Sequence, residues 1–162
     1  EKHEQWFNYI LEEVVPFIFD YNQTGMKIMT TGCSMGASHA ANFFFRRPDV
    51  FDTVIALSGY YSSDMFFNNY MDDLVYANSP LHYLEGMSYD HPHVQKYREN
   101  NIIICTGQGA WEDDMIRSTT RLKELLAYKD VGAWIDFWGH DVNHDWPWWR
   151  IQFPYFLEKV LG

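Results

Sequence analysis

A serine between two glycines is the feature of this sequence with the clearest chemistry. Residues 32–36 read Gly-Cys-Ser-Met-Gly, which matches the G-x-S-x-G pattern of a serine on a tight turn between a strand and a helix. A strand-like run, residues 27–33, precedes the serine, and a helical pattern, residues 37–46, follows it. We therefore predict that Ser34 is a nucleophile and that the Met35 amide, at the start of the helix, stabilises an oxyanion. The alternative is a turn that happens to contain serine.

Small residues surround the predicted nucleophile. We expect glycine at positions 32 and 36 because side chains there would clash within the sharp turn. Three alanines follow at helical spacing, Ala37, Ala40 and Ala41. They predict that the helix lies close to the sheet.

A serine hydroxyl needs a neighbouring base to accept its proton. Two histidines, His140 and His144, follow the last strand-like run. We choose His144 because it directly precedes the last helical segment, and we expect His140 to be structural. Two histidines four residues apart also occur in metal sites, but these fall in a loop without an evident third ligand, so no metal is expected.

Three consecutive acids, Glu112, Asp113 and Asp114, follow the third strand-like run. They lie between the serine and the histidine in the chain, which is the order of an α/β-hydrolase triad. Each fits the role of the acid that orients His144, and each also fits the acidic first turn of the next helix. We choose Asp113 as the catalytic acid and expect the other two to cap the helix.

Aromatic side chains are abundant near these residues. Tyr60 follows the second strand-like run, Trp111 precedes the three acids, and Trp146 follows the histidines. We predict that these three contact the substrate. The alternative is that they pack in the core or in a lid.

Four short apolar runs predict the strands that position these residues. They are residues 27–33, 53–58, 101–106 and 133–138. Helical patterns separate them, and the last segment, residues 147–160, has Asp145 as a good N-cap. This alternation predicts an α/β fold with a mostly parallel sheet and helices on both faces. Residues 60–98 interrupt the alternation, and we expect a lid-like insertion within a single domain, residues 1–162.

Composition excludes several classes of protein. Hydrophobic residues make up 47% of the chain, which is too many for a disordered segment. The formal net charge of −10 disfavours nucleic acid and anionic membranes as partners. Residues 1–20 indicate an amphipathic helix and not a signal peptide. Cys33 and Cys105 lie in apolar runs and are expected to be free thiols, which fits a cytoplasmic location.

Together these motifs resemble the putative-esterase family of α/β-hydrolases, which includes esterase D (S-formylglutathione hydrolase), feruloyl esterases and mycolyltransferases. The resemblance rests on residues 32–37, 47–51 and 56–59, and on the C-terminal segment from His144 to Leu157. It implies hydrolysis of small-molecule carboxylic esters or thioesters through an acyl-serine, without a cofactor, and it supports Asp113. An acyltransferase with the same triad and a non-catalytic binding protein of this fold are the alternatives.

The beginning of the chain departs from the family pattern. The family's sheet has several strands before the serine's strand, and a loop after one of them supplies a second oxyanion amide. Here one helix and a short loop precede Lys27. We therefore expect further strands upstream of Glu1 and a partial domain in this sequence.

Overall fold

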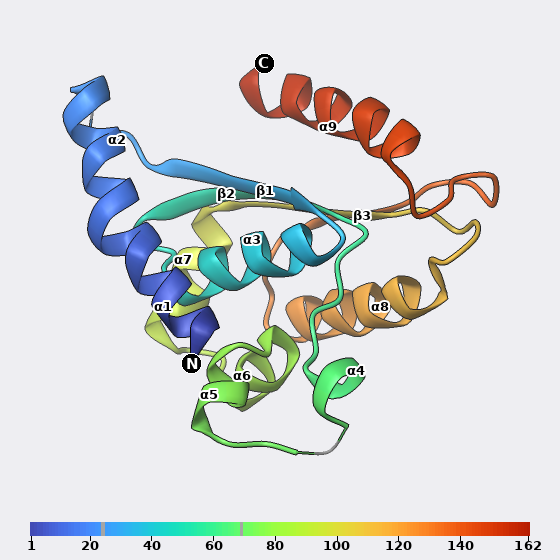
Figure 1. Cartoon of the computed structure of the whole chain (residues 1–162), viewed down its shortest axis with the longest axis horizontal. Coiled ribbons are helices and arrows are strands. Elements are labelled where there is room, and N and C mark those ends of the chain that lie inside the picture. The colour runs from blue at the N-terminus through green and yellow to red at the C-terminus, as the bar shows by residue number, and fades with distance from the viewer. Residues whose placement is uncertain (24, 69) are drawn as a thin grey trace.

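Four parallel strands form the sheet of this protein (Figure 1). The computed structural model describes residues 1–23, 25–68 and 70–162. Neighbours in the sheet follow the order of the chain, β1-β2-β3-β4, and every pairing is parallel. The strands are β1 (Ile28–Cys33), β2 (Phe51–Leu57), β3 (Asn101–Thr106) and β4 (Trp134–Phe137). The predicted α/β fold and its four strands are confirmed.

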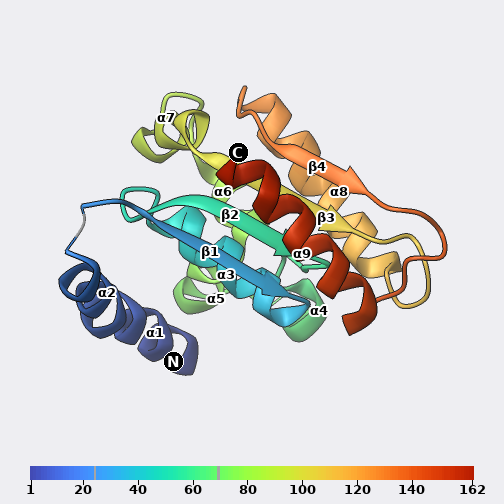
Figure 2. The same cartoon turned by 90° about the horizontal axis from the view of Figure 1, so that it is seen from above.

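Helices cover both faces of the sheet. Figures 1 and 2 show α9 on one face and α3 and α8 on the other, with α4, α5 and α6 beyond them. The helices are α1 (Lys2–Tyr9), the π-helical turn η1 (Ile10–Val14), α2 (Val15–Asn22), α3 (Met35–Arg46), α4 (Asp64–Phe67), α5 (Asp73–Ala77), α6 (Pro80–Gly86), α7 (Pro92–Glu99), α8 (Asp113–Tyr128) and α9 (Trp146–Leu161).

The two faces of the sheet bury different side chains. On the face of α3, Ala37 and Ala41 are 0% exposed and Ala40 is 4% exposed, so the prediction that this helix lies close to the sheet is confirmed. On the other face, Trp149 and Phe156 of α9 pack against alternate residues of β2 and β3. Both central strands are therefore buried on two sides, as parallel strands usually are.

The N-terminal helices pack beside α3. Phe7 of α1 stacks on Phe43 with ring centroids 5.3 Å apart. Arg46 lies over the Phe7 ring and donates two hydrogen bonds, of 2.7 and 2.9 Å, to the carboxylate of Glu4. Among the described residues, no helix is long and apolar enough to cross a membrane.

The segment 60–98, apart from residue 69, forms α4 to α7 on the α3 side of the sheet (Figure 1). Several of its side chains belong to the main core: Tyr61, Leu81, Leu84, Val94 and Tyr97. The segment therefore contributes to the packing of the domain. Its role as a lid stays a prediction.

Candidate active site

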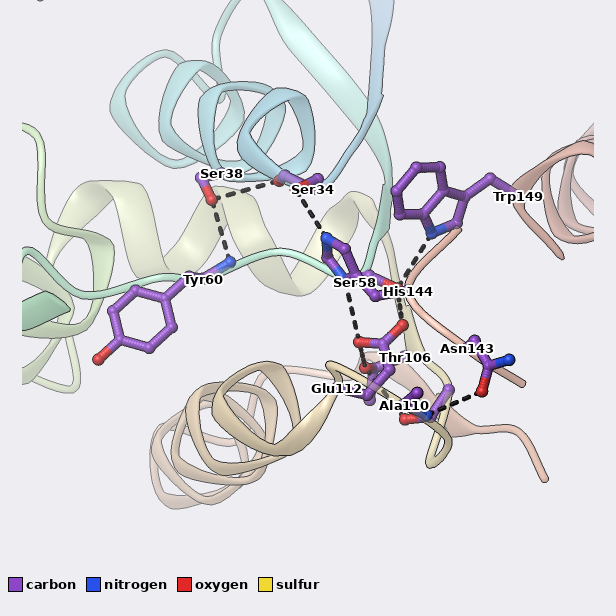
Figure 3. A network of polar contacts seen from close by, with 11 residues as sticks. Ser34, Ser38, Ser58, Tyr60, Thr106, Ala110, Glu112, Asn143, His144 and Trp149 are labelled. Carbon is purple, nitrogen blue, oxygen red and sulfur yellow. Dashed lines mark hydrogen bonds and ion pairs between the residues drawn. The ribbon is translucent and has the colours of Figure 1, made fainter. Parts of the chain in front are cut away.

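Ser34 lies on the turn that joins β1 to α3. Its backbone angles, φ 54° and ψ −124°, are in a region that residues other than glycine rarely adopt. The turn is fixed by a 2.9 Å hydrogen bond from the Ser34 amide to the Leu57 carbonyl and by a 3.0 Å bond from the Ala37 amide to the Ser34 carbonyl. The strained turn orients the Ser34 hydroxyl toward His144 (Figure 3).

The two glycines of this turn differ. A Cβ atom added to Gly32 would lie 2.2 Å from the carbonyl oxygen of Gly36, so a side chain cannot fit there. A Cβ atom added to Gly36 would meet no atom within 4 Å among the described residues. The steric prediction is confirmed for Gly32 and is wrong for Gly36 in the part of the chain that the structure describes.

His144 lies in the loop before α9. Its Nε2 atom is 2.8 Å from the Ser34 hydroxyl oxygen, and its backbone amide donates a 2.9 Å hydrogen bond to the Ala110 carbonyl. Asp145 caps α9 by accepting a 2.7 Å hydrogen bond from the Trp146 amide, as expected. The structure thus brings Ser34 and His144 together.

His140 lies in an exposed turn, and the structure gives it no contact with Ser34. No group of three or more His, Cys, Asp or Glu side chains is arranged to hold a metal ion in residues 1–23, 25–68 and 70–162.

The acid beside His144 is Glu112. Its Oε2 atom lies 3.4 Å from the Nδ1 atom of His144, and its side chain is 0% exposed. The chosen Asp113 is exposed at the first turn of α8, and Asp114 is exposed and pairs with Arg117. The structure therefore does not place Asp113 at His144, and Glu112 takes that position instead.

A change of chain direction explains this correction. Trp111 has a positive φ of 68°, which turns the chain just before the helix. Glu112 is then the N-cap residue and its side chain is buried, whereas Asp113 and Asp114 are exposed in the acidic first turn of α8. Carboxylates in that turn are favoured by the helix dipole without any contact with His144.

Two hydroxyl groups bind the buried carboxylate of Glu112. Ser58 donates to Oε1 at 2.6 Å and Thr106 donates to Oε2 at 2.9 Å. Trp149 donates in turn from its indole nitrogen to the Ser58 oxygen at 3.1 Å (Figure 3). A buried carboxylate requires such donors because it has lost its water. We did not predict Ser58, Thr106 or Trp149. The sequence signal for two of them was a hydroxyl residue at the carboxyl end of a buried strand, Ser58 directly after β2 and Thr106 at the end of β3.

The second ring nitrogen of His144, Nδ1, lacks a hydrogen bond of normal length in the described structure. Nδ1 is buried without a hydrogen-bond partner among the described residues, and 3.4 Å from the Glu112 carboxylate is longer than a hydrogen bond. For Nε2 to accept the proton of Ser34, the other proton of the ring must be on Nδ1, facing Glu112. The Trp149 ring packs edge-on against the imidazole at 5.0 Å and fixes its plane.

The amide of Met35 is the first of α3. The first four amides of a helix have no acceptor within the helix, and the helix dipole makes this end positive. Because Met35 directly follows Ser34, its amide is available beside the nucleophile. Its role as an oxyanion donor stays a prediction.

A cavity of about 260 Å³ begins at Met35, the residue after Ser34, while Ser34 itself does not line it. Tyr60 and Ser38 line it, and the Ser38 oxygen accepts a 3.0 Å hydrogen bond from the Tyr60 amide (Figure 3). Burial, with Asp64 nearby, raises the pKa of the Tyr60 phenol. Trp111 is 85% exposed and Trp146 is 59% exposed, and neither lines the cavity. Contact of these three aromatic residues with the substrate stays a prediction.

A parallel sheet with a serine at a strand–helix turn and a histidine before the last helix is the architecture of the α/β-hydrolase class. The family model described as "Putative esterase" matches residues 1–159. The chain therefore belongs to the Putative esterase family. No curated protein matches it in sequence.

Solved structures share the fold at low identity. A ferulic acid esterase matches with a TM-score of 0.75 and 19% identity, over 96% of this chain and 61% of its own. The S-formylglutathione hydrolase of Staphylococcus aureus matches with a TM-score of 0.66 and 13% identity, over 99% of this chain and 64% of its own. The fluorophosphonate-binding serine hydrolase F of the same species matches with a TM-score of 0.63 and 14% identity, over 96% of this chain and 63% of its own. The chain spans less than two thirds of each of these structures.

Proposed function

We propose that this protein hydrolyses carboxylic esters through an acyl-enzyme intermediate on Ser34. The observation that carries the proposal is the 2.8 Å contact between the Ser34 hydroxyl and Nε2 of His144. This distance is within the range that proton transfer to a general base requires. The contact joins two residues far apart in the sequence, each at the carboxyl edge of the sheet.

The reaction proceeds in two halves. His144 Nε2 takes the proton of Ser34 while the serine oxygen forms a bond to the carbonyl carbon of the ester. The bond from that carbon to the alcohol oxygen then breaks, and the imidazolium gives its proton to the departing alcohol. A water molecule attacks the acyl-serine by the same route in reverse, releasing the carboxylic acid and restoring Ser34.

Glu112 and Met35 stabilise the charges that appear during these steps. The Glu112 carboxylate faces Nδ1 of His144 and stabilises the imidazolium, and their contact of 3.4 Å is expected to shorten when the ring becomes charged. The Met35 amide donates to the oxyanion of the tetrahedral intermediate. Glu112 therefore replaces Asp113 as the proposed acid of the triad.

The comparisons support this proposal at the level of reaction class. The family is described as "Putative esterase", and three structural neighbours are named as a ferulic acid esterase, an S-formylglutathione hydrolase and a serine hydrolase. One neighbour is named as fluorophosphonate-binding, which is the behaviour of an activated serine.

The test is turnover of 4-nitrophenyl acetate and labelling by a fluorophosphonate probe, both on the full-length protein. We expect Ser34→Ala to abolish labelling and to lower kcat by a factor of about 10⁴ to 10⁶. The matched control is Ser88→Ala, because Ser88 is exposed in the turn between α6 and α7. Labelling or normal turnover in folded Ser34→Ala protein would refute the proposal.

A further inference from the structure

The cavity next to Met35 is lined by four segments of the chain, one of which is the N-terminal end with Glu1 and His3. Met35 and Ser38 come from the first turns of α3, and Tyr60 comes from the segment after β2. The wall away from the sheet comes from α4 and α5. Its apolar side chains are Phe66, Phe67, Leu74 and Val75.

The position of this cavity relative to His144 distinguishes the two halves of an ester. In the proposed reaction the carbonyl carbon bonded to Ser34 carries an oxyanion, the alcohol oxygen and the acyl group. The alcohol oxygen must face His144, which protonates it, and the oxyanion must face the Met35 amide. His144 does not line the cavity, and in Figure 3 the Tyr60 ring lies to the left of Ser34 and the imidazole to its right. The acyl group is therefore the part that points into the cavity.

Polar side chains of the cavity are largely bonded to one another. Asn42 donates a 3.0 Å hydrogen bond to Asn78, and its oxygen accepts one from Tyr83. Ser38 is bonded to the Tyr60 amide. The Ser63 hydroxyl is buried without a partner in the described part of the chain, and His3 and His39 stack on each other with ring centroids 4.8 Å apart.

The charges around the cavity disfavour an anionic ligand. Among the described residues, no lysine or arginine lines it, and Glu1 does. His3 and His39 also line it, and burial lowers the pKa of His39, which favours its neutral form. An acyl group that carries a carboxylate would therefore lose its water without gaining a cation. The cavity volume of about 260 Å³ is slightly below the range of drug-sized sites, so it suits one ring or an alkyl chain of medium length.

We propose that this cavity is the acyl-binding site and that it selects esters of uncharged, apolar acids larger than acetate. The proposal rests on the proposed function, because it requires an acyl group bonded to Ser34. It assigns selectivity to the acid half of the ester and leaves the alcohol half to the open side near His144.

Two substrate series test the assignment on the full-length protein. In the first, 4-nitrophenyl acetate, butanoate and hexanoate vary the acyl group. Each buried methylene adds up to about fourfold in binding, so we expect kcat/KM for hexanoate to exceed that for acetate at least tenfold. The 4-nitrophenyl monoester of succinic acid is expected to react at less than a tenth of the butanoate rate. In the second series, hexanoate esters of methanol, butanol and hexanol are expected to differ less than threefold.

A bulky substitution in the wall gives the matched test. Val75→Trp fills the cavity, so we expect the ratio of kcat/KM for hexanoate to kcat/KM for acetate to fall at least tenfold. Asp73→Trp is the control, because Asp73 is exposed on the same helix and does not line the cavity. Phe67→Ala enlarges the cavity at a half-exposed position, and it should raise the ratio of decanoate to hexanoate turnover at least threefold.

The possible results separate this proposal from the proposed function. Equal turnover of all acyl lengths, or an equal effect of Val75→Trp on acetate and hexanoate, would overturn the acyl site while leaving ester hydrolysis intact. If Val75→Trp does not fold, Phe67→Ala provides the test. An unchanged ratio of decanoate to hexanoate turnover in that variant would overturn the acyl site. Absence of both turnover and Ser34 labelling in the wild type would overturn the proposed function itself.

Discussion

The turn that carries Ser34 and the turn that carries Glu112 have the same construction but opposite environments. Each follows a parallel strand, lies at the carboxyl edge of the sheet and precedes a helix, and each contains a non-glycine residue with positive φ. Ser34 is partly exposed, whereas Glu112 is fully buried. The difference follows from their proposed roles, because a nucleophile must be reached by substrate and an orienting acid must be kept from water.

His144 lies between these two environments. Its side chain is 15% exposed, with one ring nitrogen facing Ser34 and the other facing Glu112. Low exposure strengthens the electrostatic effect of a carboxylate on the imidazolium. We therefore expect substitutions at the two turns to differ in their effects on kcat and on the free energy of unfolding.

Among variants that keep the nucleophile, the largest expected effect is at the buried acid. Glu112→Gln keeps the size of the side chain but removes the charge that stabilises the imidazolium, so we expect kcat to fall by a factor of about 10³ to 10⁴. Asp113→Asn, one residue away and exposed, should change kcat less than twofold. Steady-state kinetics with 4-nitrophenyl acetate measures both. A large loss in Asp113→Asn with little loss in Glu112→Gln would reverse the assignment of the acid.

The next effect concerns the stability of the nucleophile turn. Gly32→Ala places a Cβ atom 2.2 Å from the Gly36 carbonyl oxygen, so we expect the free energy of unfolding to fall by about 3 kcal/mol or more. Gly36→Ala meets no described atom and lies inside α3, where alanine is favoured over glycine by up to about 1 kcal/mol. Urea unfolding of the two variants tests the contrast. Similar losses of stability in both would contradict it.

A smaller effect is expected at the hydroxyl donors of Glu112. Ser58→Ala removes the donor to Oε1 and leaves the Trp149 indole without its acceptor. Loss of one hydrogen bond to a charged group corresponds to about 1.5–3 kcal/mol, which is 10- to 150-fold. We expect this loss mainly in kcat, since Ser58 does not line the cavity, with Ser88→Ala as the control. A change confined to KM would argue against a positioning role for Ser58.

The smallest effect concerns a half-buried carboxylate. Hydrogen bonds from Arg46 lower the pKa of Glu4 from 4.5. Its contribution to stability is therefore complete above pH 4.5 and is lost as the pH falls through the lowered pKa. Glu4→Gln should lower the free energy of unfolding by about 1 kcal/mol at pH 7 and by less below pH 4. The exposed Glu12→Gln is the control in thermal unfolding at the two pH values. A loss of stability in Glu4→Gln that is equal at the two pH values would contradict the ion pair.

The fold and half of the site were predictable from the sequence. Apolar runs ending at glycine or a hydroxyl residue located the strands, and Asp145 followed by Pro147 located the start of α9. Because parallel strands run in the same direction, their carboxyl ends lie at one edge of the sheet, so the pairing of Ser34 with His144 was predictable from the sequence.

The acid and its donors were not predictable to the residue. Glu112, Asp113 and Asp114 share the same position relative to the strand, and the backbone turn at Trp111 decides which one is buried. A positive φ at tryptophan has no signature in a single sequence. The two wrong choices, Asp113 and the steric role of Gly36, both concern the direction in which a side chain or Cβ atom points.

The proposed triad lies at one rim of the sheet, and at the opposite rim the chain reverses direction between a helix and the next strand. The reversal before β4 includes Gly132, where an added Cβ atom would meet nothing within 4 Å in the described structure. A break or an inserted domain at this point would leave the order and pairing of the strands unchanged. A fusion at that rim is therefore expected to leave the proposed site intact, with ester turnover as the reporter of correct assembly.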